Sequence, residues 1–280
     1  MQKTLIFMAA LVLLFMYLGN LIGGASGAKF ALIIACVTNF ISYFFSDKIV
    51  LKHYNATEVT MKTSPQLYQI VKRLADKAFL PMPKVYIIPE RAPNAFATGR
   101  NPEHAAVAAT QGLLDLMTPQ EVEGVLAHEM SHIKNHDILI SSVAAVFAGA
   151  IATLVNYAQT RLRQSSSGGK KAVASGLAIV LMPLAAMIIR MAISRTREFE
   201  ADAGSAELTG HPEWLISALS KLEDFSKNWQ LKNATSQTAH MFIINPLSNI
   251  SGTVANLFST HPNTQKRIDR LQEIKSSRGY

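Results

Sequence analysis

Five consecutive residues, His128-Glu129-Met130-Ser131-His132, have the types and the spacing to hold a metal ion and to use it. On a helix, positions i and i+4 project from one face about one turn apart, so both imidazoles could reach the same ion. Glu129 stands beside the first histidine, where its carboxylate could take a proton from water on the ion. The pattern predicts hydrolysis of peptide bonds at a zinc ion bound by His128 and His132, with Glu129 as the catalytic base.

Two histidines leave such a site incomplete, because a catalytic zinc ion usually takes three protein ligands and keeps a fourth position for water. The only cysteine, Cys36, lies inside an apolar run, so the third ligand must be a histidine or a carboxylate. His136 follows on the same helical face, but one straight helix is a poor source of three ligands for one ion, and we interpret it as a surface or outer histidine. The charged segment 194–202 (SRTREFEAD) is the better source.

The composition indicates that part of the protein surface faces lipid. Hydrophobic residues make up 49% of the 280 and charged residues only 16%, and the mean hydropathy is +0.18. The net charge of +8 is not accompanied by a nucleic-acid-binding motif or by a basic stripe interleaved with aromatic residues. We therefore expect no nucleic-acid partner, and we attribute the positive charge to attraction toward anionic lipid head groups.

Four stretches of the sequence carry no charged residue: 4–28, 30–46, 138–160 and 172–189. A helix needs about 20 apolar residues to cross the hydrocarbon layer of a bilayer. We expect the first two stretches to form a transmembrane hairpin within residues 1–46, with a signal peptide as the alternative for the first. The other two predict a second apolar hairpin within residues 138–192, for which the alternative is a pair of buried helices.

The polar segments must supply the elements that position the motif. Ser64-Pro65 predicts the start of a helix that runs to about residue 80. Residues 84–88 and 105–110 predict strands, and residues 93–99 predict a turn or an edge segment.

A second helix is expected to carry the two histidines. Thr118 and Glu121 form a capping-box pattern, with Pro119 at the first helical position. This helix should run to about residue 135, and residues 190–280 are expected to be mainly helical.

These motifs together resemble the HtpX family of bacterial membrane-bound zinc metalloproteases, which is distantly related to the CAAX prenyl endoproteases. The resemblance covers nearly the whole chain. It rests on the N-terminal hairpin, residues 94–97 (NAFA), residues 128–137 (HEMSHIKNHD), residues 194–202 and residues 259–262 (STHP). The family often continues with two prolines after the late histidine, whereas this chain has Asn263 after Pro262.

The resemblance implies a set of site residues and a fold. Glu198 would be the third ligand of a single Zn²⁺, and Asp202 would orient the imidazole of His128. Helical periodicity is consistent with this, because Glu198 and Asp202 lie one turn apart while Glu200 lies about 200° around the helix. We expect Glu200 on the solvent side, together with Arg197.

The expected fold is a mainly α membrane protein with a zincin-type α+β catalytic domain and a small sheet. The N-terminal hairpin occupies residues 1–46. Residues 47–137, with HExxH, and residues 193–280, with the third ligand, form the two parts of the protease domain. The second apolar hairpin, residues 138–192, separates them.

Two further segments have alternative interpretations. His261 either caps the helix that begins near residue 263 or stabilises the oxyanion of the reaction, as a histidine does in related enzymes. The residues Asn94, Ala95, Phe96 and Ala97 form either a plain turn or, as the resemblance implies, an edge strand that pairs with an extended peptide substrate.

The distribution of charge favours a bacterial inner-membrane, multi-pass protein whose active site faces the cytoplasm. Residues 47–137 and 190–280 carry most of the lysines and arginines. The four positive charges of residues 161–171 would oppose this rule if that loop lay outside. The resemblance implies that the substrates are damaged or misfolded membrane proteins, cleaved as part of quality control.

A membrane zinc-binding or transport protein without proteolytic activity is the alternative function. Glu129 argues against it, because transport needs no base beside the first ligand. An intramembrane protease is disfavoured by the charged residues around the motif, which include Glu121, Glu123, Lys134 and Asp137.

Overall fold

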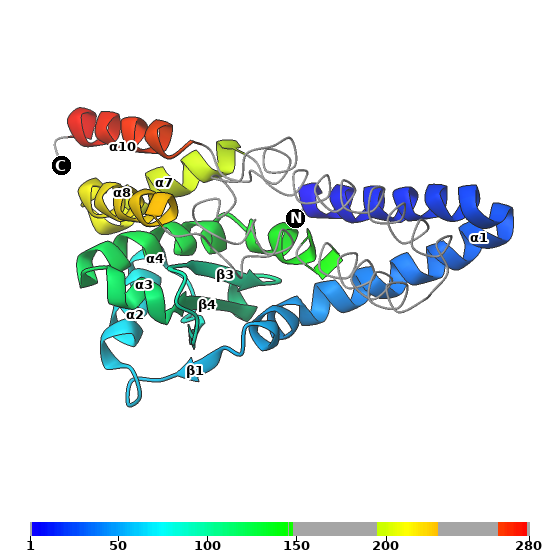
Figure 1. The fold of residues 1–280 in the computed structure, drawn as a ribbon, viewed down its shortest axis with the longest axis horizontal. Helices are drawn as coiled ribbons and strands as arrows, with labels where there is room; N and C mark the ends of the chain where they lie inside the picture. The colour runs from blue at the N-terminus through cyan, green and yellow to red at the C-terminus, as the bar shows by residue number, and fades with distance from the viewer. Residues whose placement is uncertain (1, 145, 148–194, 229–262, 279–280) are drawn as a thin grey trace.

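The computed structural model describes residues 2–144, 146–147, 195–228 and 263–278. Its N-terminal region is the apolar helix α1 (Gln2–His53), which reverses direction at Gly24. The φ of Gly24 is +58°, a conformation that glycine adopts without steric penalty. Across the two arms, the side-chain amide of Asn39 donates to the carbonyl oxygen of Met8 at 3.3 Å. Helix α1 therefore forms a hairpin, and its second arm continues past residue 46 (Figure 1); that this hairpin crosses a membrane stays a prediction.

The outer surface of α1 is apolar and exposed. Among the described residues, the arm from Gly24 to His53 is the one helix long and apolar enough to cross a membrane, and Thr4–Tyr17 is a shorter apolar segment. Phe30, Ile33 and Val37 on this arm are 52–67% exposed. Such a surface is suited to contact with lipid rather than with water.

A small mixed sheet lies beyond the end of α1, with strand order β1-β2-β4-β3. Its strands are β1 (Thr57–Val59), β2 (Lys84–Ile88), β3 (Ala95–Gly99) and β4 (Ala105–Thr110). Strand β2 pairs with β4 in parallel, and β1 and β3 are antiparallel to their neighbours. The predicted strands 84–88 and 105–110 are confirmed, whereas β1, only three residues long, was not predicted.

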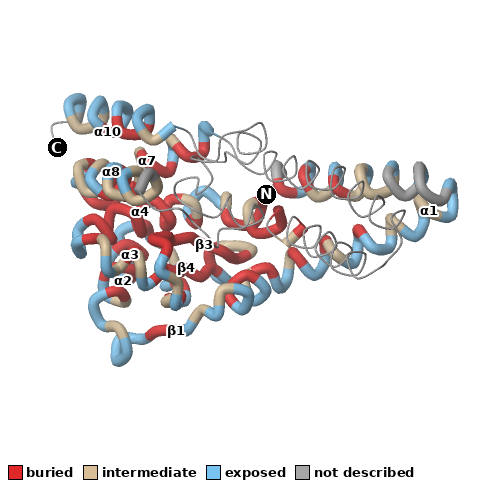
Figure 2. The backbone as a smooth tube through the Cα atoms, viewed as in Figure 1, coloured by how far each residue is buried: buried red, intermediate tan, exposed pale blue. Residues whose placement is uncertain are grey.

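The helix α4 (Pro119–Lys134) lies between the sheet and the C-terminal helices (Figure 1). Its predicted capping box is present: the Thr118 hydroxyl accepts from the Glu121 amide at 3.3 Å, and the Glu121 carboxylate accepts from the Thr118 amide at 2.8 Å. Most of its residues are buried, because neighbours cover it on several sides (Figure 2). Its histidines therefore do not belong to the solvent face of an amphipathic helix.

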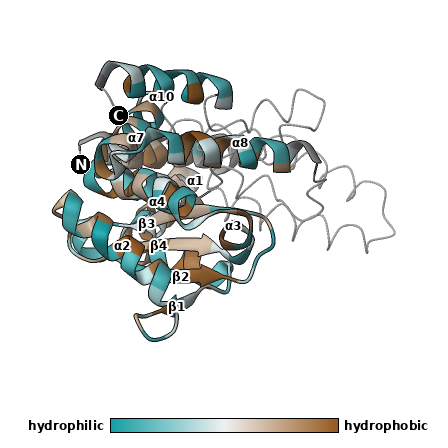
Figure 3. Cartoon of the chain, turned by 90° about the vertical axis from the view of Figure 1, so that its left-hand side faces the viewer, coloured by the Kyte–Doolittle hydropathy of each residue, from teal (hydrophilic) through white to brown (hydrophobic). Residues whose placement is uncertain are grey.

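The remaining helices surround this centre. They are α2 (Pro65–Ala78), the 3₁₀ turn η1 (Pro102–His104), α3 (Gln111–Leu116), α7 (Arg195–Thr209), α8 (Pro212–Asn228) and α10 (Thr264–Arg278). Helices α2 and α10 are amphipathic, with hydrophilic residues outward and hydrophobic residues toward the interior (Figure 3). Most of the second predicted apolar hairpin lies outside the described residues; residues 138–144 are helical.

Helices α4 and α7 approach closely at small residues. A Cβ atom on Gly204 would lie 2.4 Å from the Ser131 hydroxyl and 2.9 Å from the Ser131 Cβ. Near this contact, the Ser205 hydroxyl donates to the carbonyl oxygen of Gly124 at 2.7 Å. The distance between the two helices therefore depends on the absence of a side chain at Gly204.

We predict that Gly204→Ala separates α4 from α7 and lowers thermal stability. Overpacking should destabilise the protein by about 1–3 kcal/mol, against about 1 kcal/mol gained from helix propensity. The double variant Gly204→Ala/Ser131→Gly should recover stability, because it removes the atoms that the new methyl group meets. Thermal unfolding in detergent measures both, and a double variant no more stable than the single one would contradict this account.

Candidate metal centre

Three predicted ligand residues meet at one point between α4 and α7. His128 and His132 come from α4 and Glu198 from α7, and one ligand atom from each lies within 4.8 Å of the others. The Nε2 atoms of the two histidines are 3.2 Å apart. The carboxylate oxygens of Glu198 lie 3.7 Å from His128 Nε2 and 3.6 Å from His132 Nε2. Two imidazole nitrogens and a carboxylate around one point form a set that could hold a metal ion.

The far side of the His128 ring is held by a buried carboxylate. Asp202, one turn after Glu198, lies with its Oδ1 2.9 Å from His128 Nδ1. Arg267 of α10, itself 1% exposed, donates to both oxygens of Asp202, from Nε at 2.9 Å and from NH2 at 2.6 Å. Burial would raise the pKa of Asp202, but the charge and hydrogen bonds of Arg267 and His128 hold it below its usual value. An ionised Asp202 accepts from Nδ1–H and leaves Nε2 free for a metal.

His132 has a similar arrangement with longer distances. Its Nδ1 lies 3.4 Å from Asp137 Oδ2, and Arg197 NH1 lies 3.6 Å from the other oxygen of Asp137. The chain turns at His136, whose φ is +59°, and the Asp137 amide then donates to the His132 carbonyl oxygen at 2.9 Å. This turn brings the Asp137 carboxylate back to the metal site.

Arg197 and His136 are two residues near the metal site whose positions were predicted from the sequence. Arg197 was expected on the solvent side, and this is wrong: it is 8% exposed, because the approach of α7 to the end of α4 covers it. His136 is exposed at the turn and is not part of the cluster of ligand atoms.

The site stabilises positive charge. Burial by itself would lower the pKa of His132, but the hydrogen bond that His132 donates to Asp137 and the charges of Glu198, Glu129 and Asp137 raise it to about 9. Carboxylates gathered around two imidazoles would stabilise a metal cation in the same way.

Glu129 connects the metal site to the edge of the sheet. Its side chain is 7% exposed, and its Oε2 accepts from the Ala97 amide of β3 at 2.9 Å. Strand β3 is one of the two edge strands of the described sheet, and the Thr110 amide of β4 donates to the Asn94 carbonyl oxygen at 2.8 Å. Because hydrogen-bonding directions alternate along a strand, Ala95 and Ala97 direct their backbone groups away from β4.

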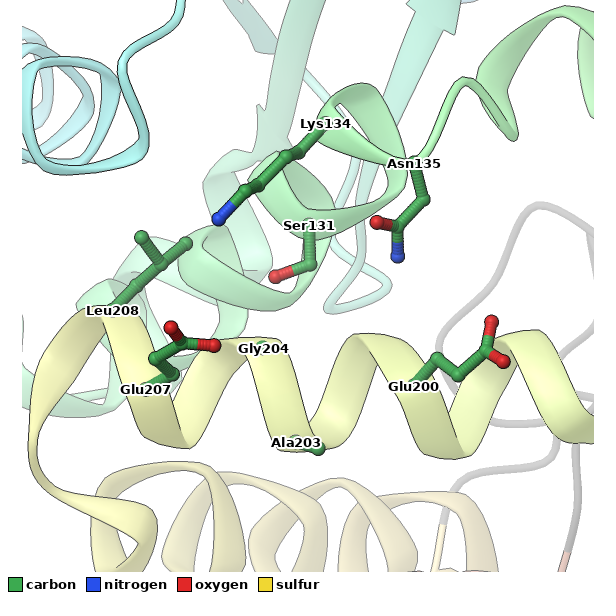
Figure 4. A pocket seen from close by; sticks show the side chains of 8 residues that line it. All are labelled: Ser131, Lys134, Asn135, Glu200, Ala203, Gly204, Glu207 and Leu208. Atoms are coloured by element: carbon green, nitrogen blue, oxygen red, sulfur yellow. The ribbon is translucent and has the colours of Figure 1, made fainter.

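Glu200 lies on another face of α7. It lines a separate cavity of about 270 Å³ between α4 and α7, together with Lys134, Asn135 and Glu207 (Figure 4). It is exposed, as expected, and it does not join the ligand cluster. His261, the other candidate, lies outside the described residues.

Three residues of this centre were not predicted from the sequence: Asp137, Arg197 and Arg267. Asp137 and Arg197 lie inside the two motifs, residues 128–137 and 194–202, so their positions in the chain were a usable signal. No such signal marks Arg267, because it is one of several charged residues on a hydrophilic helix. Only the packing of α10 against α7 and α8 buries it.

We predict that Arg267→Met destabilises the protein by about 3–5 kcal/mol, because it leaves the charge of Asp202 buried without its partner. Thermal unfolding in detergent measures the loss. The matched control is Lys266→Met, which removes the same charge from the adjacent, exposed position. Equal losses in the two variants would show that the Asp202–Arg267 pair has no special role.

Comparisons with known proteins identify a family and, separately, a protein of similar fold. The model of peptidase family M48 matches residues 61–275. Proteins named protease HtpX homolog are 57% identical in Campylobacter hominis, with 98% of both chains covered, and 52% identical in Sulfurovum sp., with 98% and 99% covered. The crystal structure of S. mikatae Ste24p has a TM-score of 0.50 at 21% identity. The alignment covers 93% of this chain and 61% of that one, and it shows likeness of fold.

Proposed function

The chain belongs to peptidase family M48, and we propose that it hydrolyses peptide bonds with one zinc ion held by His128, His132 and Glu198. The family match, the HtpX relatives and the apolar helix α1 make it a membrane-associated metallopeptidase. The observation that carries the zinc proposal is the convergence of two imidazoles and one carboxylate, with a second carboxylate beside them. This donor set suits catalytic zinc, which keeps one position for water.

When bound, zinc supplies an activated water and polarises the scissile carbonyl group. Glu129 accepts the proton of that water and passes it to the leaving amine. The Ala97 amide holds the Glu129 carboxylate in place at 2.9 Å. Asp202, fixed by Arg267, keeps the His128 ring oriented with its Nε2 toward the metal.

An extended peptide substrate would lie along β3, at residues Asn94, Ala95, Phe96 and Ala97. The position of this strand at the edge of the sheet, beside Glu129, supports the proposal. Because Glu129 already accepts from the Ala97 amide, the peptide would pair mainly with the outward carbonyl groups. His261 remains a candidate donor to the oxyanion.

The cellular setting belongs to the same proposal. A bacterial inner membrane, several membrane crossings and an active site facing the cytoplasm are supported by the distribution of lysine and arginine and by the bacterial relatives. Damaged or misfolded membrane proteins, cut for quality control, are the proposed substrates.

Glu129→Gln should retain zinc, because the three ligands are unchanged. Its rate of peptide hydrolysis should fall by about 10²–10⁴-fold, because the base is removed. Zinc content and cleavage of a model protein substrate are measured on the same detergent-purified sample, with a chelator-treated wild type as the control. Cleavage near the wild-type rate would refute the role of Glu129. Wild-type protein that binds zinc and never hydrolyses a peptide would favour the transport alternative.

Glu198→Ala should lose tight zinc binding and activity together, whereas Glu200→Ala should keep both. The two carboxylates are two residues apart on one helix, so the pair is a matched control for charge and for helix composition. Zinc content after dialysis distinguishes the variants. Loss of zinc from Glu200→Ala, with zinc retained in Glu198→Ala, would overturn the ligand assignment.

A further inference from the structure

Near the end of α1, its apolar surface gives way to charged residues. Residues 30–46 carry no charged side chain and extend over about 25 Å of helix, at roughly 1.5 Å per residue. Exposed aromatic side chains continue to Phe44 and Phe45, and the first charges that follow are Asp47 and Lys48. Aromatic residues followed by charged ones are typical of the boundary between hydrocarbon and head groups.

A cavity of about 890 Å³ opens at this level, between the last turns of α1 and the sheet. One wall comes from α1, with Lys48, Leu51 and Lys52, and the opposite wall includes Glu103 of η1 and Ala106 of β4. The cavity therefore joins the membrane helix to the catalytic part and has both apolar and charged sides.

Four charged side chains that line this cavity form no ion pair among the described residues. They are Lys48 and Lys52, one turn apart on α1, Asp47 next to them, and Glu103 on the opposite wall. By contrast, the cavity's other lysine, Lys84, has its carboxylate partner Glu58 at 3.2 Å. Lys48, Lys52 and Glu103 are exposed, and the Lys48 ammonium stands 5.6 Å from the centroid of the Phe45 ring. A lining with two cations and two anions that form no ion pair is complementary to a ligand that carries both signs.

We propose that this cavity binds the head group of a membrane phospholipid of the phosphatidylethanolamine type. The phosphate lies with Lys48 and Lys52 on the α1 wall, and the primary ammonium donates to Glu103 on the opposite wall. The acyl chains follow the exposed face of α1 that continues through Phe44 and Phe40. Arg100, whose guanidinium stands 5.4 Å from the Phe44 ring, adds a cation beside that face.

The proposal depends on the protein's place in a membrane and not on its zinc chemistry. A primary ammonium donates hydrogen bonds to carboxylates, which the quaternary ammonium of phosphatidylcholine does not do at the same net charge. Phosphatidylglycerol carries the phosphate without the cation. Comparing these three lipids therefore tests recognition of the phosphate and recognition of the ammonium separately.

The test uses delipidated full-length protein in dodecyl maltoside, with each lipid added as mixed micelles. Native mass spectrometry measures bound lipid, and thermal unfolding measures stabilisation. Phosphatidylethanolamine should bind about tenfold more tightly than phosphatidylcholine, as one charge-assisted hydrogen bond predicts. Equal binding of the two, or the same stabilisation by free phosphoethanolamine alone, would overturn the proposal.

Variants test separately the residues proposed to bind the phosphate and the residue proposed to bind the ammonium. Lys48→Gln/Lys52→Gln should weaken binding of all three lipids by about 30-fold, because each lysine near a lipid head group contributes roughly fivefold. Glu103→Gln should abolish the preference for phosphatidylethanolamine over phosphatidylcholine and leave phosphatidylglycerol binding unchanged.

The control Lys62→Gln/Lys72→Gln removes two exposed lysines away from the cavity and should change lipid binding by neither measure. All variants should cleave substrate in detergent as the wild type does, and an equal loss of lipid in the control would refute the site.

Discussion

The buried ion pair between Asp202 and Arg267 is the interaction on which the metal centre depends. Both side chains are 1% exposed, so each charge has left water, and Arg267 donates to both carboxylate oxygens of Asp202. Such a pair holds its geometry because any displacement leaves an uncompensated charge in the interior. Asp202 contacts His128 directly, so the C-terminal helix α10 controls the orientation of an imidazole on α4, 139 positions earlier in the chain.

Helix α4 makes the contacts that connect the parts of the site. On one side its Glu129 carboxylate accepts from the edge strand β3, and on the other its histidines face Glu198 of α7. Gly204 allows the two helices to approach closely enough for this, since a side chain there would collide with Ser131. The proposed base, the proposed ligands and the proposed substrate strand therefore share one rigid support, which a metallopeptidase needs if the reacting groups are to be aligned before substrate arrives.

The apolar helix α1 and the catalytic part are joined at a polar boundary. The apolar surface of α1 ends where Asp47, Lys48 and Lys52 begin, and the cavity at that end is closed by residues of the sheet. The same sheet carries β3 beside Glu129. The proposed lipid site, which includes residues of β2 and β4, and the proposed substrate strand β3 thus belong to one small sheet, which suits a peptidase that works beside a bilayer.

Local sequence determined much of this protein. The spacing of His128 and His132, the capping box at Thr118 and the strands 84–88 and 105–110 depend on neighbours in the chain, and the structure has each of them. The meeting of these histidines with Glu198 was inferred from family resemblance and helical periodicity, and only tertiary packing brings the three together. Packing alone decided the burial of Arg197 and Arg267 and the use of the Ala97 amide by Glu129. The reason is physical: a charged residue on a hydrophilic helix has the same local pattern whether water or a buried carboxylate is its partner.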